Sequence, residues 1–416
     1  MFRSLIKSKN IFQKSFVINQ LFNRNNIKIK NNSCNYYFKR NYTSYDELGR
    51  NFLKNYRNVK DEFSSSKLYE KINDENKELL KKINSENTLY LSRLITTIES
   101  TREDHQEQSR MIISYLSSLA KEKGTQYNSF RIGISGPPGA GKSTFIEAFG
   151  KYLTSLGHKV AVLAIDPSSI RSGGSILGDK TRMTELSVDP NAYVRPSATR
   201  GSLGGITKGT SDTIVLCESA GFDIVIVETV GVGQSEVSID DMVDCFVLLV
   251  PPANGDELQG LKKGIVESAD LVVVNKADGE LLPKARFTVS EYTSAFKLQR
   301  PKNQHWISKV VSCSSISKEH IDNVWNTMCE FKKVMMNCGD FKTKRSHQKE
   351  TFMKKLLDEE LLTLLYHNED VQKVIPYFEQ QVKDGILSPT LASNEIIKTF
   401  LISEKHKLLN NDSNKK

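Results

Sequence analysis

The chain has 416 residues, 38% hydrophobic and 26% charged, which fits one large α/β domain with helical additions, or two domains. Residues 1–42 hold nine basic residues and no Asp or Glu, so they account for the formal charge of +9, and the other 49 basic residues balance 49 acidic ones. The charge pattern after residue 42 therefore gives no electrostatic reason to expect binding to nucleic acid or to an anionic membrane.

The N-terminal segment is basic throughout, and the first acidic residue of the chain is Asp46. Basic residues interleaved with Phe, Leu, Ile and Val, and rich in Asn and Ser, are typical of a mitochondrial transit peptide; a disordered basic tail is the alternative. Arg40-Asn41-Tyr42-Thr43 resembles a matrix-peptidase site, with arginine two residues before the last removed one. We predict that residues 1–42 are a transit peptide cleaved after Tyr42 and that the protein works in the mitochondrial matrix.

Residues 43–125 are polar and favour helices. Apolar positions recur at helical spacing, as at Leu89, Leu91, Leu94 and Ile95. We predict a helical N-terminal region.

Residues 126–340 alternate short β-branched runs with helical segments. The predicted strands are 131–135, 160–165, 223–227, 245–250, 271–275 and 306–312. This alternation predicts βαβ units and a mostly parallel sheet flanked by helices, an α/β fold. The most apolar run, 245–250, ends at Pro251-Pro252 and is shorter than the roughly 18 residues that a membrane span needs, so we expect a soluble mature protein.

The run GPPGAGKS matches the pattern GxxxxGK[ST] between a predicted strand and a predicted helix. Glycines let successive backbone N–H groups converge on phosphate oxygens, and the following helix directs its positive end at the same anion. We expect Lys142 to neutralise charge on the β- and γ-phosphates and Ser143 to ligate Mg²⁺. The predicted phosphate-binding residues are Gly136, Pro137, Pro138, Gly139, Ala140, Gly141, Lys142, Ser143 and Thr144.

The run Asn275-Lys276-Ala277-Asp278 matches NKxD at the end of a buried strand, about 130 residues after the phosphate loop. The Asp278 carboxylate can accept hydrogen bonds from the guanine ring N–H and exocyclic amine, a donor pair that adenine lacks. Asn275 is expected to hold the loop and base edge, and the Lys276 stem to cover the base. The sequence therefore predicts GTP and GDP as ligands.

A further buried strand ends in Glu228-Thr229-Val230-Gly231, resembling a Walker B acid followed by switch II. Glu228 would bind Mg²⁺ through water or orient the attacking water, and the Gly231 N–H would meet the γ-phosphate. Gln234 is the other candidate for orienting the water. The proposed catalytic residues are Lys142, Glu228 and Gln234.

Two more acids follow predicted strands or loops of this region. Asp166 ends the second predicted strand and Asp179 lies in a polar loop, so both are candidates for the metal shell, along with Ser143 and Glu228. A cap or a turn is the structural alternative for each. The seven histidines form no HxxxH or HExxH pattern and no Cys/His cluster, and the six cysteines are scattered, so we predict reduced thiols and no metal beyond Mg²⁺.

Residues 341–410 return to a helical pattern, and residues 411–416 are predicted to be a disordered tail. One apolar stripe recurs at helical spacing, formed by Phe352, Leu356, Leu357, Leu361, Leu362 and Leu365. From the pattern alone, this stripe either packs on the sheet domain or docks on a second subunit.

Together these motifs resemble the family of methylmalonyl-CoA mutase-associated GTPases, the MeaB and ArgK-like P-loop GTPases, over roughly residues 89–333. The most distinctive runs are GGSILGDKTRM at 173–183 and ETVGVGQSE at 228–236. The resemblance implies a P-loop NTPase of the SIMIBI type that acts as a mitochondrial GTPase. Its implied role is to chaperone the adenosylcobalamin-dependent mutase, gating cobalamin loading and protecting or reactivating the mutase.

The resemblance also implies a homodimer whose C-terminal helical arm contributes to the dimer, with an adenosyltransferase as a possible further partner. Ser314 and Ser315 stand where the family has its last guanine-contacting loop, usually Ser-Ala, and His320 stands where glycine is common. Three alternatives stay open: a nickel-inserting metallochaperone GTPase, a kinase-like phosphotransferase, and a non-enzymatic scaffold. The first predicts a His-rich or Cys/His metal cluster, the second transfer of phosphate from ATP, and the third a degenerate nucleotide site.

Overall fold

The computed structural model describes residues 63–85, 87–166, 183–198, 203–229, 239–252, 263–298 and 300–413. At the ends of some elements, namely 165–166, 197–198, 203–208, 263 and 406–413, it describes the backbone alone. Residues from Ser65 onward belong to one compact unit.

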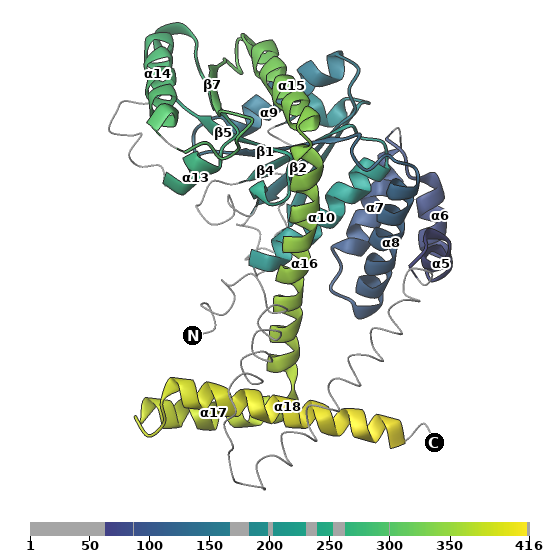
Figure 1. Ribbon diagram of the computed structural model, residues 1–416. Coiled ribbons are helices and arrows are strands. Elements are labelled where there is room, and N and C mark those ends of the chain that lie inside the picture. Colours follow the sequence, from purple (N-terminus) through teal and green to yellow (C-terminus); the bar gives the residue numbers. More distant parts are fainter. Residues whose placement is uncertain are drawn as a thin grey trace, which may run out of the picture. The chain divides into compact units, whose positions relative to one another are not determined.

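The centre of the described chain is a parallel β-sheet of seven strands (Figure 1). Their order across the sheet is β3-β2-β4-β1-β5-β6-β7, and every neighbouring pair is parallel. The predicted α/β fold is therefore confirmed. The strands are β1 (Phe130–Ser135), β2 (Val160–Asp166), β3 (Ala192–Ala198), β4 (Ile224–Thr229), β5 (Cys245–Val250), β6 (Leu271–Val274) and β7 (Lys309–Ser312).

Side chains that alternate along the strands enter two different cores, one on each face of the sheet. In β4, Val225 and Val227 join one hydrophobic cluster, whereas Ile224 and Ile226 join the other. Because both faces are buried, the inner strands are nearly continuous runs of apolar residues, as expected for a parallel sheet covered by helices. This explains why these runs were recognisable in the sequence.

Strand β3 was not predicted. It lies at the edge of the sheet, paired only with β2 among the described strands, and it contains Arg195 and Pro196. Proline cannot donate a ladder hydrogen bond and is confined mainly to edge strands and bulges. The sequence of β3 therefore lacks the apolar run by which the other strands were recognised.

Fourteen helical elements accompany the sheet within the described residues. The α-helices are α5 (Ser65–Glu70), α6 (Asp74–Lys82), α7 (Thr88–Ile98), α8 (Glu103–Glu122), α9 (Lys142–Ser155), α10 (Leu203–Ser219), α13 (Lys263–Ser268), α14 (Leu282–Leu298), α15 (Ile321–Asn337), α16 (Asp340–His367), α17 (Glu369–Lys383) and α18 (Pro389–Ser413). Two short 3₁₀ helices complete the set, η2 (Leu186–Val188) and η3 (Gly279–Leu281).

Helices α5 to α8 lie between residues 65 and 122, within the region where the sequence predicts helices. Leu91, Leu94 and Ile95 of α7 are fully buried and share a core cluster with β4 and α14. Polar contacts add to this packing: the Ser92 and Tyr193 hydroxyls lie 3.0 Å apart, and Arg195 pairs with Glu99. The N-terminal helices therefore cover one face of the sheet.

Helix α16 begins beside the sheet and leads to α17 and α18, which pack on each other (Figure 1). Asn368 caps α17 by accepting hydrogen bonds from the backbone N–H groups of Asp370 and Val371. In the predicted apolar stripe, Leu357, Leu361 and Leu362 are each at least half exposed, so these residues do not pack on the sheet. No helix among the described residues is long and apolar enough to cross a membrane.

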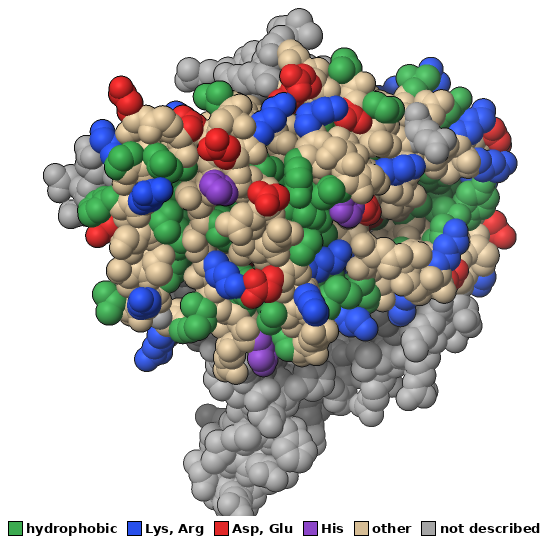
Figure 2. All heavy atoms as spheres, turned by 90° about the horizontal axis from the view of Figure 1, so that it is seen from above, with side chains coloured by type: hydrophobic (Ala, Val, Ile, Leu, Met, Phe, Trp, Pro, Cys, Tyr) green, Lys and Arg blue, Asp and Glu red, His purple; other side chains and the backbone are tan. Residues whose placement is uncertain are grey.

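Charged side chains of both signs are interspersed on the face of the molecule seen in Figure 2. Basic and acidic groups alternate there with small hydrophobic areas. This distribution agrees with the equal numbers of basic and acidic residues after position 42.

Candidate nucleotide-binding site

The phosphate-loop candidate, residues 136–143, follows β1 directly and ends in the first turn of α9. Gly136 passes so close to β5 that a Cβ atom there would lie 1.9 Å from the Leu249 carbonyl oxygen. Gly141 has φ 85°, in the left-handed region that favours glycine, and serves as the N-cap of α9. Gly136 begins the GxxxxG pattern, and Gly141 ends it directly before Lys142. The backbone geometry thus requires glycine at both positions.

The loop is suited to an anion. Its N-cap, Gly141, has no side chain that could satisfy the first N–H groups of α9, and phosphate oxygens fit such groups at a positive helix end. The Lys142 ammonium group lies over the same loop, donating to the carbonyl oxygens of Gly136 at 2.7 Å and Pro137 at 3.3 Å. Pro138, Gly139 and Thr144 are exposed, whereas Ala140 is buried.

Two predicted metal ligands meet beside this loop. Glu228 pairs with Ile134 in the register of β4 with β1, which brings its side chain next to α9. The Ser143 hydroxyl donates to Glu228 Oε1 at 3.1 Å, and Glu228 is buried. Mg²⁺ prefers hard oxygen donors, so this hydroxyl and carboxylate fit a Mg²⁺ ion.

Four predicted residues are described in part or not at all. The backbone of Asp166 ends β2, which pairs in parallel with β4, so Asp166 lies at the same carboxyl edge of the sheet as Glu228. The side chain of Asp166 lies outside the described residues, and so do Asp179, Gly231 and Gln234. Their roles stay predictions.

Asn275 connects the phosphate loop to the segment predicted to read guanine. It follows β6, is 1% exposed, and donates from Nδ2 to the Ala140 carbonyl oxygen at 3.0 Å. Its Oδ1 accepts from the backbone N–H of Ser315 at 3.1 Å and from the Ser315 hydroxyl at 2.6 Å. One buried carboxamide thus joins three loops that are far apart in sequence.

The Cys313 thiol also approaches this carboxamide, with Sγ 3.9 Å from Asn275 Oδ1. Burial raises the pKa of Cys313 to about 12, so the sulfur stays a neutral thiol and a weak donor at physiological pH. Cys313 therefore supports the loop by packing, and no motif in the sequence includes it.

Asp278 lies beside the same loop and accepts a hydrogen bond from the Ser314 hydroxyl. An ionised carboxylate has about four lone-pair positions, so one bond to serine leaves capacity for the guanine donors. The Ser314 N–H donates to the Glu319 carbonyl oxygen at 3.0 Å, and the Ser315 N–H is taken by Asn275. The geometry supports Ser314 and Ser315 as residues that position Asp278 and Asn275.

Lys276, between these two residues, has φ 58° and is half-buried. The next residue, Ala277, donates its backbone N–H to the Cys313 carbonyl oxygen at 3.0 Å. The chain therefore turns sharply after β6.

A buried hydroxyl pair that no sequence motif indicated lies at the ends of β1 and β4. The Thr229 hydroxyl donates to Ser135 Oγ at 2.9 Å, and both residues are at most 1% exposed. Ser135 precedes the phosphate loop and Thr229 follows Glu228. A polar residue at the end of an otherwise apolar strand was the available signal.

Comparison with known proteins agrees with this geometry. A protein-family model described as "Methylmalonyl Co-A mutase-associated GTPase MeaB" matches residues 91–370. A Mus musculus protein named "Methylmalonic aciduria type A homolog, mitochondrial" is 49% identical over 314 residues, which cover 74% of this chain and 76% of the mouse protein. Escherichia coli GTPase ArgK is 42% identical over 299 residues, covering 72% of this chain and 88% of that protein.

Among solved structures, the "Crystal structure of LAO/AO transport system kinase" superposes with a TM-score of 0.62 at 34% sequence identity. The match covers 79% of this chain and 98% of that one. The family match spans both halves of the site, from the phosphate loop to Ser315. The chain therefore belongs to the family of methylmalonyl Co-A mutase-associated GTPases, MeaB, and is a P-loop GTPase.

Proposed function

We propose that this GTPase hydrolyses GTP to GDP and phosphate as a chaperone of adenosylcobalamin-dependent methylmalonyl-CoA mutase, gating cobalamin loading and protecting or reactivating the mutase. The observation that carries the proposal is the family match over residues 91–370, which includes the phosphate loop and the Asn275–Asp278 segment. The mouse relative, named for methylmalonic aciduria, supports the same process. Fold likeness alone would not support a specific partner.

The nucleotide site supports hydrolysis assisted by Mg²⁺. Ser143 and Glu228 would hold the ion with their adjacent oxygens, and Asp166 and Asp179 are proposed as further oxygen donors. When bound, the ion would neutralise charge on the β- and γ-phosphates. Lys142 would neutralise the same charge from the loop, and Glu228 or Gln234 would orient the attacking water.

We further propose a location in the mitochondrial matrix. The acid-free residues 1–42 have the composition of a transit peptide, and the mouse relative bears the word mitochondrial in its name. Bacterial relatives also match, so the name of one relative does not decide the location. Fusion of residues 1–42 to a fluorescent protein tests the proposal: mitochondrial import supports it and a diffuse signal contradicts it.

A homodimer formed through the C-terminal helices is the proposed assembly. Large apolar side chains stay exposed along this part of the chain, and contiguous exposed apolar surface marks interaction sites. The exposed residues are Met353, Leu357, Leu361, Leu362, Leu364, Tyr366, Tyr377, Ile386, Leu391, Ile397, Leu401 and Ile402. Light scattering should give a dimer mass for the wild type and a monomer mass for a Leu361→Glu, Leu362→Glu variant. A monomeric wild type would contradict this assembly.

The chaperone role is tested by measuring GTP turnover with and without purified mutase. We expect a low intrinsic rate of GTP hydrolysis, which rises when the mutase supplies or induces stabilisation of the transition state. Lys142→Ala is the matched control, because any turnover that survives it comes from a contaminant. Turnover that the mutase leaves unchanged, together with no nucleotide-dependent capture of the mutase, would remove the chaperone proposal. Phosphate transfer from labelled ATP to a protein or small molecule would instead favour the kinase-like alternative.

A further inference from the structure

Three potential metal ligands meet where α15 passes into α16, away from the nucleotide site. One ligand atom each from His305, Cys338 and Asp340 lies within 4.8 Å of the other two. No Cys/His cluster is visible in the sequence because β7 and α15 separate His305 from Cys338 along the chain. Folding alone brings these side chains together.

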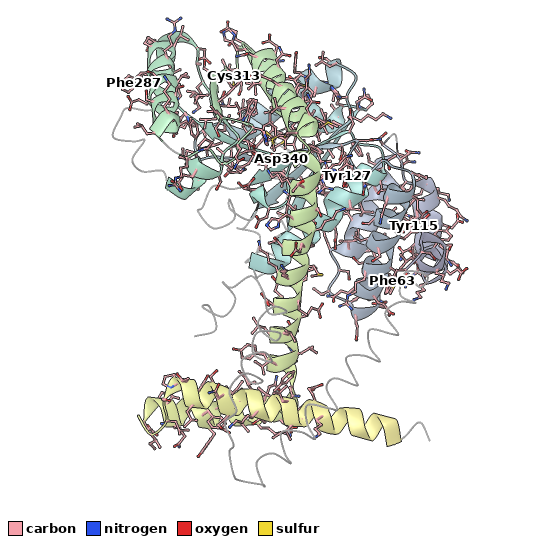
Figure 3. All side chains as sticks on the ribbon, in the orientation of Figure 1. Phe63, Tyr115, Tyr127, Phe287, Cys313 and Asp340 are labelled. Atoms are coloured by element: carbon pink, nitrogen blue, oxygen red, sulfur yellow. The ribbon has the colours of Figure 1, made fainter. Side chains whose placement is uncertain are left out.

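The backbone at this joint is tightly specified. Cys338 caps α15, Gly339 turns the chain with φ 83°, and Asp340 opens α16 (Figure 3). Asp340 Oδ2 lies 3.0 Å from His305 Nδ1 and accepts from Asn303 Nδ2 at 3.0 Å. Asn303 Oδ1 in turn accepts from the His305 backbone N–H at 2.7 Å, which fixes the loop that carries the histidine.

Buried aromatic residues beside the ligands hold this arrangement in place. Trp306, next to His305, donates from Nε1 to the Asp270 carbonyl oxygen at 2.8 Å and packs edge-on against Phe331 of α15. Phe341, next to Asp340, is also buried. The ligand side chains themselves remain reachable, since His305 is 51% and Asp340 32% exposed. Two ligands thus come from the ends of helices and the third from a loop that hydrogen bonds and the buried Trp306 hold in place.

We propose that His305, Cys338 and Asp340 bind one Zn²⁺ ion, with water in the fourth position. A thiolate, an imidazole nitrogen and a carboxylate oxygen form a ligand set of the kind that zinc takes in tetrahedral sites. The ion would join the two ends of the β7–α15 segment, whose intervening loop carries Ser314 and Ser315. It would also fix the start of α16, so that bound zinc stiffens the connection between the guanine-reading loop and the C-terminal helices.

The competing interpretation is a hydrogen-bonded His305–Asp340 pair with no ion. Co²⁺ distinguishes the two, because a thiolate ligand gives a charge-transfer absorption band that a His–Asp pair cannot give. The full chain is first saturated with GDP and Mg²⁺, so that Co²⁺ does not report on the nucleotide site. We expect one equivalent of Co²⁺ to give a thiolate band that Zn²⁺ abolishes.

Two cysteine variants make the test specific. Cys338→Ser should remove the band and weaken Zn²⁺ binding by at least the roughly 10- to 100-fold that losing even an outer-shell partner costs. Cys329→Ser is the matched control, because Cys329 is an exposed free thiol of α15 that lies outside the cluster. It should keep both the band and the affinity.

Stability gives a second readout. Zn²⁺ should raise the Tm of the wild type and of Cys329→Ser, but not of Cys338→Ser or His305→Gln, because an ion bound to the folded state alone stabilises that state. His305→Gln changes an exposed side chain and keeps the test decisive if Cys338→Ser does not fold. Absence of a thiolate band, or a band that survives Cys338→Ser, would overturn the proposal. Neither of these two outcomes would contradict the proposed GTP hydrolysis, because both concern the zinc site alone.

Discussion

Arg345 of α16 and Asp244, the residue before β5, form a buried ion pair, with Nη2 2.6 Å from Oδ2 and Nε 2.7 Å from Oδ1. Each side chain is only 2% exposed. The remaining guanidinium donors bond the carbonyl oxygens of Gln126 at 2.7 Å and Ser129 at 3.0 Å, and the Phe341 ring lies 4.9 Å from the guanidinium carbon. These contacts therefore link the start of α16 to the amino-terminal edge of the sheet.

This ion pair predicts a large effect of Arg345→Ala on stability. Removing Arg345 takes away both guanidinium hydrogen bonds to the buried Asp244 carboxylate, which keeps the Arg131 backbone N–H at 2.8 Å. Breaking a buried ion pair in this way costs about 3–5 kcal/mol of unfolding free energy. Lys354→Ala on the same helix is the matched control, because its pair with Glu350 is exposed to solvent and should contribute nothing measurable. Urea denaturation measures both variants. Equal midpoints for Arg345→Ala and wild type would contradict the prediction.

The same pair predicts a dependence on pH. Burial alone raises the pKa of Asp244, but Arg345 and Arg131 together outweigh it and hold that pKa below its ordinary value of 3.8. A carboxyl whose folded-state pKa is depressed stabilises the protein above its unfolded pKa and loses that contribution as pH falls through the folded pKa. The stability gap between wild type and Arg345→Ala should therefore be constant near neutral pH and narrow below about pH 4. A gap that widens in acid would exclude this account.

Much of the fold was predictable from sequence for a physical reason. Buried parallel strands must be apolar on both faces, so β1, β2, β4, β5 and β6 appear as runs that a reader can find. The edge strand β3 carries Arg195 and Pro196 and escapes that rule. The helix pattern after residue 341 predicted an apolar stripe but not its surroundings, because periodicity identifies a face and not what covers it.

The candidate site was predictable as motifs but not as contacts. The phosphate loop and Asp278 were found because each motif is local in sequence. The bonds from Asn275 to Ala140 and Ser315 join segments far apart in sequence, and only the sheet order brings them together. His320, where the family favours glycine, has φ 60°, which is the left-handed backbone that glycine adopts most easily.

Two glycines of the phosphate loop predict different outcomes for one substitution. Gly139 and Gly141 have nearly the same φ, 83° and 85°, so alanine strains the backbone equally at both. A Cβ at Gly141 would lie 2.8 Å from Asn275 Nδ2, whereas at Gly139 nothing lies within 4 Å. Gly141→Ala should therefore weaken GDP binding at least about tenfold more than Gly139→Ala, an added cost of about 1.4 kcal/mol. Calorimetric titration decides this, and equal losses would mean that Asn275 does not constrain the loop.

Ser315 stands where the family usually has alanine. We predict that its hydroxyl gives this chain a modest gain in GDP affinity. Its hydroxyl donates to Asn275 Oδ1 at 2.6 Å, and the backbone N–H donor at 3.1 Å remains after Ser315→Ala. Loss of one buried hydrogen bond costs about 1 kcal/mol, so GDP affinity should fall about fivefold. Ser317→Ala, an exposed change in the same loop, is the control and should leave affinity unchanged. Wild-type affinity in Ser315→Ala would show that the extra bond does not stabilise the site.

We propose that Asp278 reads guanine at a site built from the phosphate loop and the end of β6. The most direct measurement compares GTP and XTP hydrolysis by the wild type and Asp278→Asn, because the exchange replaces an acceptor oxygen by a donor that suits the xanthine carbonyl. We expect the wild type to prefer GTP and the variant to prefer XTP. A variant that keeps the wild-type preference for GTP would contradict it.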